Sequence, residues 1–349
     1  MNRAITTAII TLLFGATLLQ LAQAQSQGAE KKTVSLTGVN IAGADFGDQH
    51  RPGIFGQDYI YPKLSSIDYF GAKGMNIIRL PVLWERLQHQ LRGNLDEMEM
   101  RRVDGVVNYV TSKGMRIIID VHNYANYYRS VIGTDNLPAS ALGDLWGQIA
   151  ARYKDNNLVV FGLMNEPTRL QTETWLEAAN DAIAKIRQTG AKNLILVPGN
   201  GWSSARDWKS AKYGTPNGKV MLNVVDPSDN FVFEVHQYFD HSFTGSHADC
   251  QSADIGVASL TPFTQWAREH GKRGFLGEFG AGADPNCLVT LDRVLNFMAV
   301  NNDVWLGWTY WAAGSWWPKD YFTNVEPLDG SDRPQMVVLE RYINNESKP

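Results

Sequence analysis

The stretch "LVVFGLMNEP", residues 158–167, sets an amide and a carboxylate at the end of an apolar run. Its first seven residues are apolar or glycine, which is typical of a strand buried on both faces of a parallel sheet. Asn165 and Glu166 follow. Pro167 disfavours helical backbone at Glu166, so we expect the chain to stay extended there. A charged group at this position is costly to desolvate unless it has partners or a task.

Seven other stretches have the same apolar character and alternate with helical patterns. The eight expected strands cover residues 34–40, 75–81, 115–124, 158–167, 193–202, 231–239, 273–280 and 304–311. Helices are expected between them, for example over 141–155 and 172–190, where apolar residues recur every three to four positions. Gly74, Gly114 and Gly190 each close such a segment shortly before a strand. Eight strand–helix units predict an α/β fold, a (β/α)8 TIM barrel in a single domain.

The first residues have the layout of an export signal. Arg3 precedes an apolar run at residues 8–19, and Ala22-Gln23-Ala24 offers a small-x-small cleavage site. We expect a signal peptide at 1–24, a flexible tail at 25–32 and the barrel domain at 33–349. The protein is then secreted, extracellular or periplasmic, with no membrane attachment after cleavage. An uncleaved anchor is the alternative.

The net charge and the cysteine count limit which binding partners and which metal sites we expect. A formal net charge of −4 on 349 residues gives no reason to expect nucleic acid or an anionic membrane, and we expect a monomer. Export favours a disulfide between the two cysteines, Cys250 and Cys287, although two buried thiols are the alternative. Two cysteines cannot form a four-thiolate zinc site.

Polar and aromatic residues end six of the expected strands. In a barrel these strand ends meet at one face, where the site lies. They are Arg79, His122 with Asn123, Asn165 with Glu166, His236 with Tyr238, Glu278, and Trp308 with Trp311. Two carboxylates facing one cleft are what glycoside hydrolysis needs. A Tyr238 hydroxyl there would hold a carboxylate ionised, and His236 shares its strand face. Taken singly, Arg79 suits a buried ion pair and the histidines suit structural hydrogen bonds.

Together these motifs resemble glycoside hydrolase family 5. "NIIRLPVLWERLQ", "DVHNYANYY", "GLMNEP", "EVHQYFD", "GEFG" and "YWAAGSWW" carry the resemblance, while "PGNGWSSA" and the two cysteines resemble its fungal-type endoglucanase branch. The resemblance implies Glu166 as acid/base and Glu278 as nucleophile. It implies supporting roles for Arg79, His122, Asn165, His236 and Tyr238. Trp311 is the expected sugar platform; Trp202, Trp84, Trp316 and Trp317 are weaker substrate-binding candidates, the last three equally suited to the core.

The expected enzyme is a secreted endo-β-1,4-glucanase, a cellulase acting on β-glucan polysaccharides or oligosaccharides with retention, and transglycosylation is a second possible outcome. Its carboxyls should lie about 5–5.5 Å apart, and no metal or cofactor is required. The same chemistry on β-mannan, xyloglucan or mixed-linkage glucan is an alternative. So is a non-catalytic sugar-binding barrel. A metal-dependent hydrolase would need grouped ligands, and only His236, His241 and His247 share a stretch. No linked cellulose-binding module is recognised, so we expect weak binding to crystalline cellulose.

Overall fold

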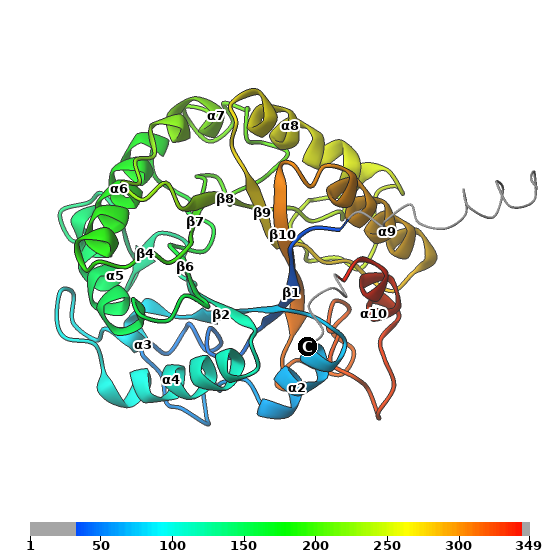
Figure 1. The fold of residues 1–349 in the computed structure, drawn as a ribbon, viewed down its shortest axis with the longest axis horizontal. Helices are drawn as coiled ribbons and strands as arrows, with labels where there is room; N and C mark the ends of the chain where they lie inside the picture. Colours follow the sequence, from blue (N-terminus) through cyan, green and yellow to red (C-terminus); the bar gives the residue numbers. More distant parts are fainter. Residues whose placement is uncertain (1–32, 344–349) are drawn as a thin grey trace, which may run out of the picture. The chain divides into compact units, whose positions relative to one another are not determined.

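Eight parallel strands close into a barrel that helices surround (Figure 1). The strands are β1 (Leu36–Ile41), β2 (Ile77–Val82), β3 (Arg116–Val121), β6 (Val159–Gly162), β7 (Ile195–Pro198), β8 (Phe231–His236), β9 (Gly274–Glu278) and β10 (Trp305–Ala313). Their order around the barrel follows their order along the chain, and β10 closes it by pairing with β1. Each predicted strand overlaps one of these, so the (β/α)8 prediction is confirmed.

The connecting helices agree with the periodicity of the sequence. They are α2 (Leu64–Ala72), α3 (Trp84–Leu87), α4 (Glu97–Ser112), α5 (Ser140–Tyr153), α6 (Thr172–Gln188), α7 (Asn217–Val220), α8 (Ile255–Glu269), α9 (Pro285–Val300) and α10 (Pro334–Leu339), with 3₁₀ turns η1 (Met221–Asn223) and η2 (Glu340–Tyr342). Gly74, Gly114 and Gly190 follow α2, α4 and α6 with φ of +93°, +74° and +89°, which lets the chain turn into the next strand. A small hairpin, β4 (Asn126–Tyr127) and β5 (Ser130–Val131), follows β3.

The computed structural model describes residues 33–343. The predicted signal peptide at 1–24 and tail at 25–32 lie outside this range, as do residues 344–349, so those boundaries stay predictions. No helix within 33–343 is long and apolar enough to cross a membrane.

The inside of the barrel changes from apolar to charged along the strands. Seven strands each give one buried apolar residue to an inner cluster: Leu36, Ile77, Ile118, Val160, Leu196, Val232 and Phe275. Side chains two residues apart on a strand point the same way. Two residues further along β2, β3 and β8 come Arg79, Asp120 and Glu234, all fully buried. The apolar layer therefore forms the floor on which a charged layer rests.

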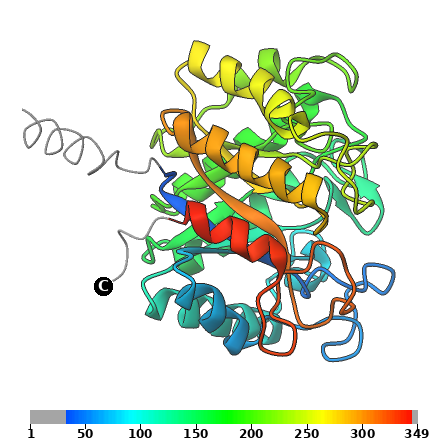
Figure 2. The ribbon, with the colours of Figure 1, turned by 90° about the vertical axis from the view of Figure 1, so that its right-hand side faces the viewer.

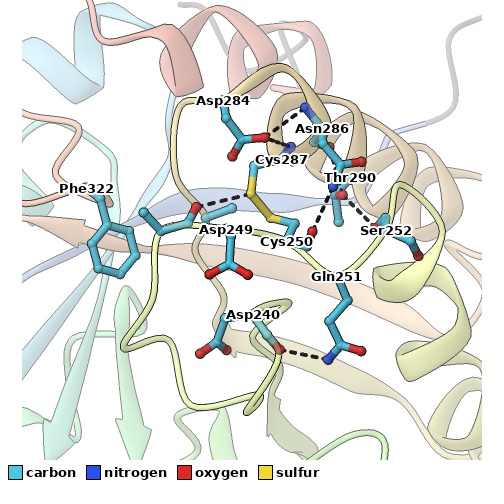
Figure 3. The surroundings of a disulfide bond; sticks show 12 residues. Asp240, Asp249, Cys250, Gln251, Ser252, Asp284, Asn286, Cys287, Thr290 and Phe322 are labelled. Atoms are coloured by element: carbon cyan, nitrogen blue, oxygen red, sulfur yellow. Dashed lines mark hydrogen bonds between the residues drawn. A yellow bond between two sulfur atoms is a disulfide. The ribbon is translucent and has the colours of Figure 1, made fainter.

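The carboxyl ends of the strands carry the longer loops, which gather at the right-hand side of Figure 2. The loop after β8 is joined to the start of α9 by a disulfide between Cys250 and Cys287, with Cα atoms 5.3 Å apart (Figure 3). The predicted disulfide is confirmed, although Cys287 lies in the first turn of α9 and not in a loop. Asn286 donates to the backbone oxygen of Cys250 at 2.8 Å, a second link between the same segments.

Candidate active site

Two carboxylates face each other where β6 and β9 end. Glu278 is the last residue of β9, and Glu166 lies four residues beyond the end of β6. One oxygen of each lies within 4.8 Å of the other and of a ring nitrogen of His236. That separation is close to the roughly 5–5.5 Å between the carboxyl groups of retaining glycosidases.

Glu166 has a left-handed backbone, with φ of +42°. The expectation of an extended backbone here is wrong, because Pro167 excludes the right-handed helical conformation but not this one. Neighbouring loops hold the turn: Tyr124 N donates to the oxygen of Asn165 at 3.0 Å, and Trp202 N donates to that of Pro167 at 3.2 Å. Left-handed backbone at a non-glycine residue costs on the order of 1–3 kcal/mol and is concentrated at functional sites.

A bulge in β9 aims Glu278 at the cleft. Val235 of β8 pairs with Leu276, but the next residue, His236, pairs with Glu278, so Gly277 is the extra residue. A side chain at Gly277 would place its Cβ 2.0 Å from an oxygen of Glu234. The glycine thus makes room for the fully buried Glu234 carboxylate, which lies close to the chain just before Glu278.

Arg79 is the centre of the charged layer. Its Nη1 donates to Glu278 Oε1 at 2.8 Å, and its Nη2 donates to Asn165 Oδ1 at 3.0 Å. It also donates from Nη1 to Asn40 Oδ1 at 2.9 Å and forms ion pairs with Asp120 at 3.1 Å and Glu234 at 3.0 Å. The guanidinium is fully buried, and these anions compensate for its desolvation. Asn165 Nδ2 is buried and has no partner within residues 33–343, which leaves a donor for a substrate hydroxyl.

His236 lies between three carboxylates. Its Nδ1 is 2.9 Å from Glu166 Oε1 and 3.6 Å from Glu278 Oε2, and its Nε2 is 3.3 Å from Glu234 Oε1. Burial lowers the pKa of the imidazole, but attraction to Glu278 and hydrogen bonds to the other two carboxylates outweigh it and raise the pKa to about 10. Tyr238 completes the group by donating to Glu278 Oε2 at 3.0 Å.

The surroundings move the pKa values of the two carboxyls apart. Burial raises the pKa of Glu166, and the nearby Glu278 charge adds to this, against the opposing effect of His236. Burial also acts to raise the pKa of Glu278, but the charges of His236, Arg79 and His122 and the Tyr238 hydrogen bond outweigh it, and the pKa is lowered. One carboxyl therefore tends to keep its proton while its neighbour ionises, the condition for separate acid and nucleophile roles.

His122 supports the aromatic wall of the site. Its Nδ1 is 2.7 Å from Asp120 Oδ2, and its ring stacks on Trp311 with centroids 5.6 Å apart and planes at 18°. Trp311 is half-buried and donates from Nε1 to Tyr321 Oη at 3.2 Å. Trp317 meets Trp311 edge-on at 6.2 Å and stacks on Tyr321 at 4.1 Å. The predicted Trp311 and Trp317 thus share one wall.

The other predicted tryptophans have different surroundings. Trp202 is 42% exposed and packs edge-on against Tyr213 at the rim, where a sugar can reach it. Trp316 is 39% exposed. The prediction that Trp84 contacts substrate is wrong: it is fully buried, its Nε1 donates to Gln88, and its ring packs on Tyr127. It begins α3, all four residues of which are buried.

Glu166, His236 and Glu278 are close enough to hold a metal ion. A metal ligand must offer a lone pair, so a coordinating imidazole has to lose its acidic proton. Attraction to Glu278 and the hydrogen bonds to Glu166 and Glu234 outweigh burial and raise the pKa of His236 to about 10, which favours its protonated form. The three histidines that share one stretch of the sequence do not form a ligand set, since His236 is buried while His241 and His247 lie on the exposed loop after β8. The site therefore suits proton transfer better than metal ligation.

A cavity of about 530 Å³ opens beside these carboxylates. Its lining includes Glu166, Tyr238, Tyr124, Trp202 and Tyr213. Another cavity, of about 560 Å³, lies at the amino-terminal ends of the strands and contains neither carboxylate. We take the first as part of the substrate cleft, because Glu166 and Tyr238 line it.

Asp120 and Glu234 belong to the site but were absent from the sequence-based set. Each lies two residues before a predicted histidine, on the same strand face as His122 and His236. That spacing was a readable signal. Tyr321 contacts Trp311 from a loop after β10, and no local sequence pattern predicts this contact.

Comparison with known families agrees with this geometry. Residues 28–314 match the family described as "Cellulase (glycosyl hydrolase family 5)". The chain belongs to glycosyl hydrolase family 5. As a member, it is a glycoside hydrolase on a (β/α)8 barrel, which confirms the family resemblance.

Individual family members resemble the chain over most of its length. It is 36% identical to endo-beta-1,4-glucanase B of Emericella nidulans over 325 residues, covering 93% of this chain and 96% of that protein. An endo-beta-1,4-glucanase from Xanthomonas axonopodis pv. citri superposes with a TM-score of 0.87 at 43% identity, covering 89% of this chain and 98% of that one. XacCel5A in complex with cellopentaose is similar, with a TM-score of 0.87, 45% identity, and coverage of 88% and 99%.

Proposed function

We propose that this protein is a secreted endo-β-1,4-glucanase that hydrolyses internal bonds of cellulose-type glucans by retaining double displacement. The observation that carries this is the pair Glu166 and Glu278, whose oxygens lie within 4.8 Å of one another at the mouth of the barrel. A separation this short leaves no room for the water that an inverting enzyme places between its carboxyls.

The first step uses the two carboxyls in opposite protonation states. Glu278 attacks the anomeric carbon as the glycosidic C–O bond breaks, and Glu166 gives its proton to the departing oxygen. Burial acts to raise the pKa of Glu278, but the charges of His236 and Arg79 outweigh it and lower the pKa. A carboxyl that ionises easily suits the role of nucleophile. The raised pKa of Glu166, caused first by burial, supports its role as acid.

The second step reverses the roles. Once Glu278 is esterified its negative charge is gone, so Glu166, now a carboxylate, can take a proton from water. The resulting hydroxide-like oxygen attacks the anomeric carbon and releases Glu278. A sugar hydroxyl in place of water would give transglycosylation by the same route.

Two residues of the site and two similar proteins support a β-glucan as the substrate. Trp311 is half-buried in the aromatic wall of the site, and Asn165, whose Nδ2 has no partner within residues 33–343, shares Arg79 with Glu278. The similar XacCel5A was solved with cellopentaose. The similar chain from Emericella nidulans is named an endo-beta-1,4-glucanase.

The test is cleavage of a panel of soluble polymers, with products sized and the anomer of the first product followed by proton NMR. We expect carboxymethylcellulose to give fragments of many lengths, with β-anomers appearing first. A Glu278→Gln variant, nearly isosteric, is the control and should cleave none of the polymers. First-formed α-anomers would contradict the retaining mechanism. Faster cleavage of mannan or xyloglucan would reassign the substrate, and binding without cleavage would favour the sugar-binding barrel.

A further inference from the structure

A separate cavity of about 420 Å³ adjoins the cleft across Trp202. Tyr124 and Trp202 line both spaces, so the two are contiguous at these rings. The charged residues that line the smaller cavity are Arg51, Arg129, Arg169 and Asp48. We call it the arginine side cavity. Nothing in the proposed double displacement requires it.

Its charges do not balance. Arg51 is committed, because its Nη1 donates at 2.7 Å to Glu85, a carboxylate with a fully buried side chain. Asp48 lies 3.7 Å from the same arginine. Arg129 and Arg169 are both exposed, and neither has a carboxylate within 4.0 Å in the part of the chain from 33 to 343. Two free guanidiniums on a chain of net charge −4 therefore flank the cleft.

The position of Arg129 is fixed by the β4–β5 hairpin and by the contact of that hairpin with Glu85. It forms the two-residue turn between β4 and β5 with Tyr128, both with positive φ, as tight hairpins require. Tyr128 N donates to Glu85 Oε1 at 2.7 Å, so the carboxylate that holds Arg51 also anchors the hairpin. Arg169 comes from the other side, three residues after Glu166. The cavity is thus built on segments that the active site already holds in place.

We propose that the arginine side cavity binds a carboxylate carried on a substituent of the glucan chain, through Arg129 and Arg169. A guanidinium pairs with a carboxylate through two parallel hydrogen bonds, and Trp202 offers the apolar face of the substituent a surface. If the glucan lies in the cleft, its substituent would reach the arginine side cavity between Tyr124 and Trp202, which line both spaces. The inference rests on the proposed function, because the cleft has to hold the backbone of the polymer.

The test compares two polymers with one backbone: anionic carboxymethylcellulose and neutral hydroxyethylcellulose. For the double variant Arg129→Gln/Arg169→Gln we expect KM on carboxymethylcellulose to rise roughly five- to tenfold, as two exposed pairs allow. On hydroxyethylcellulose we expect kcat and KM to stay within about twofold of wild type. About 0.5 M salt should remove most of the difference between the polymers for wild type, because such pairs are screened.

The matched control is Arg101→Gln/Arg273→Gln, which changes the net charge equally at two exposed arginines that, within residues 33–343, have no carboxylate within 4.0 Å and do not line the cavity. It should leave both KM values unchanged. The inference is overturned if the control variant raises KM on carboxymethylcellulose as much as the double variant does. It is also overturned if the double variant raises KM equally on both polymers, or leaves KM on carboxymethylcellulose unchanged. A wild-type protein that cleaves neither polymer would instead overturn the proposed function, and the inference with it.

Discussion

The hydroxyl of Tyr238 lies 3.0 Å from Glu278 and donates to it. Burial, above all, raises the pKa of Tyr238 well above its ordinary value, so the donor keeps its proton at any working pH. For Tyr238→Phe we expect kcat to fall roughly 10²–10³-fold, as on losing one preorganised donor. The acidic limb of the pH–rate profile should move to higher pH, because the lost hydrogen bond helped to lower the pKa of Glu278. An unchanged kcat and acidic limb would assign the ring to packing alone.

The two glutamates can be told apart by chemical rescue. Glu278→Ala should fail on every substrate, but azide placed in the vacated space would give an α-glycosyl azide from an activated β-glycoside. Glu166→Ala should still form the covalent intermediate from aryl glycosides with good leaving groups, which need no protonation. NMR of the azide products and burst kinetics check both. A β-azide from the first variant would reverse the assignment.

Glu234 is the residue whose effect on pH should oppose that of Tyr238. It faces Arg79, His236 and Glu278, it is fully buried, and its charge disfavours ionisation of Glu278 while binding Arg79. With Glu234→Gln, Glu278 loses a repelling neighbour while the charge of Arg79 stays beside it. We therefore expect the acidic limb to move to lower pH, with kcat reduced roughly tenfold, less than the 10²–10⁴-fold of a general acid.

Glu234→Asp is the control for charge, since it keeps the carboxylate one methylene shorter. Its acidic limb should stay near that of wild type even if kcat falls. Should both variants lose rate with no movement of the limb, Glu234 would be a packing residue only. Circular dichroism melts of both variants separate unfolding from either result.

At the scale of elements, the loop over residues 240–250 is tied to α9 and packs on the active site. Asp240 accepts from the backbone of Thr244 and Gly245 at 2.9 and 3.1 Å. A Cβ at Gly245 would come within 2.4 Å of the Tyr238 ring, so this turn lies directly against it. The disulfide at Cys250 therefore restrains the loop that packs on Tyr238, the donor to Glu278.

We expect Cys250→Ser/Cys287→Ser to lower both stability and activity. The bridge spans a sequence separation of 37, for which chain entropy gives roughly 3–4 kcal/mol, or several degrees in Tm. kcat measured well below Tm should also fall, because the turn at Gly245 loosens. A Gly245→Ala variant with the disulfide intact separates the two effects. Unaltered kcat in the double variant would show that the loop does not support Tyr238.

At the scale of the whole molecule, export is the open prediction. Full-length protein produced in a secreting host should yield a mature chain beginning at Gln25, read by N-terminal sequencing, because the small-x-small site ends at Ala24. An Ala24→Pro variant should block this cleavage while an Ala29→Pro variant should not. A secreted product that still begins at Met1 would contradict the signal peptide.

The sequence by itself determined the barrel and most of the candidate site. Eight apolar runs alternating with helical stripes leave few ways to bury both strand faces, and the polar residues that follow those runs must meet at one end. Glu166, Glu278, His236 and Tyr238 could be named on that ground, and two-residue spacing would have added Asp120 and Glu234. These inferences needed only local periodicity and the rule that parallel strands end together.

Only the tertiary structure decided which aromatic side chains are free and how the charges pair. Trp84 and Trp202 both follow strands, yet one is fully buried and the other 42% exposed, because burial depends on what packs against a loop from elsewhere. The bulge at Gly277 sets the direction of Glu278, and the left-handed turn at Glu166 was contrary to expectation. Nothing in the sequence around Arg51 and Arg129 tells which of the two arginines has an acidic partner. In the structure, Glu85 pairs with Arg51, whereas Arg129 has no carboxylate within 4.0 Å in residues 33–343. Ion pairing depends on distance in space and not on distance along the chain.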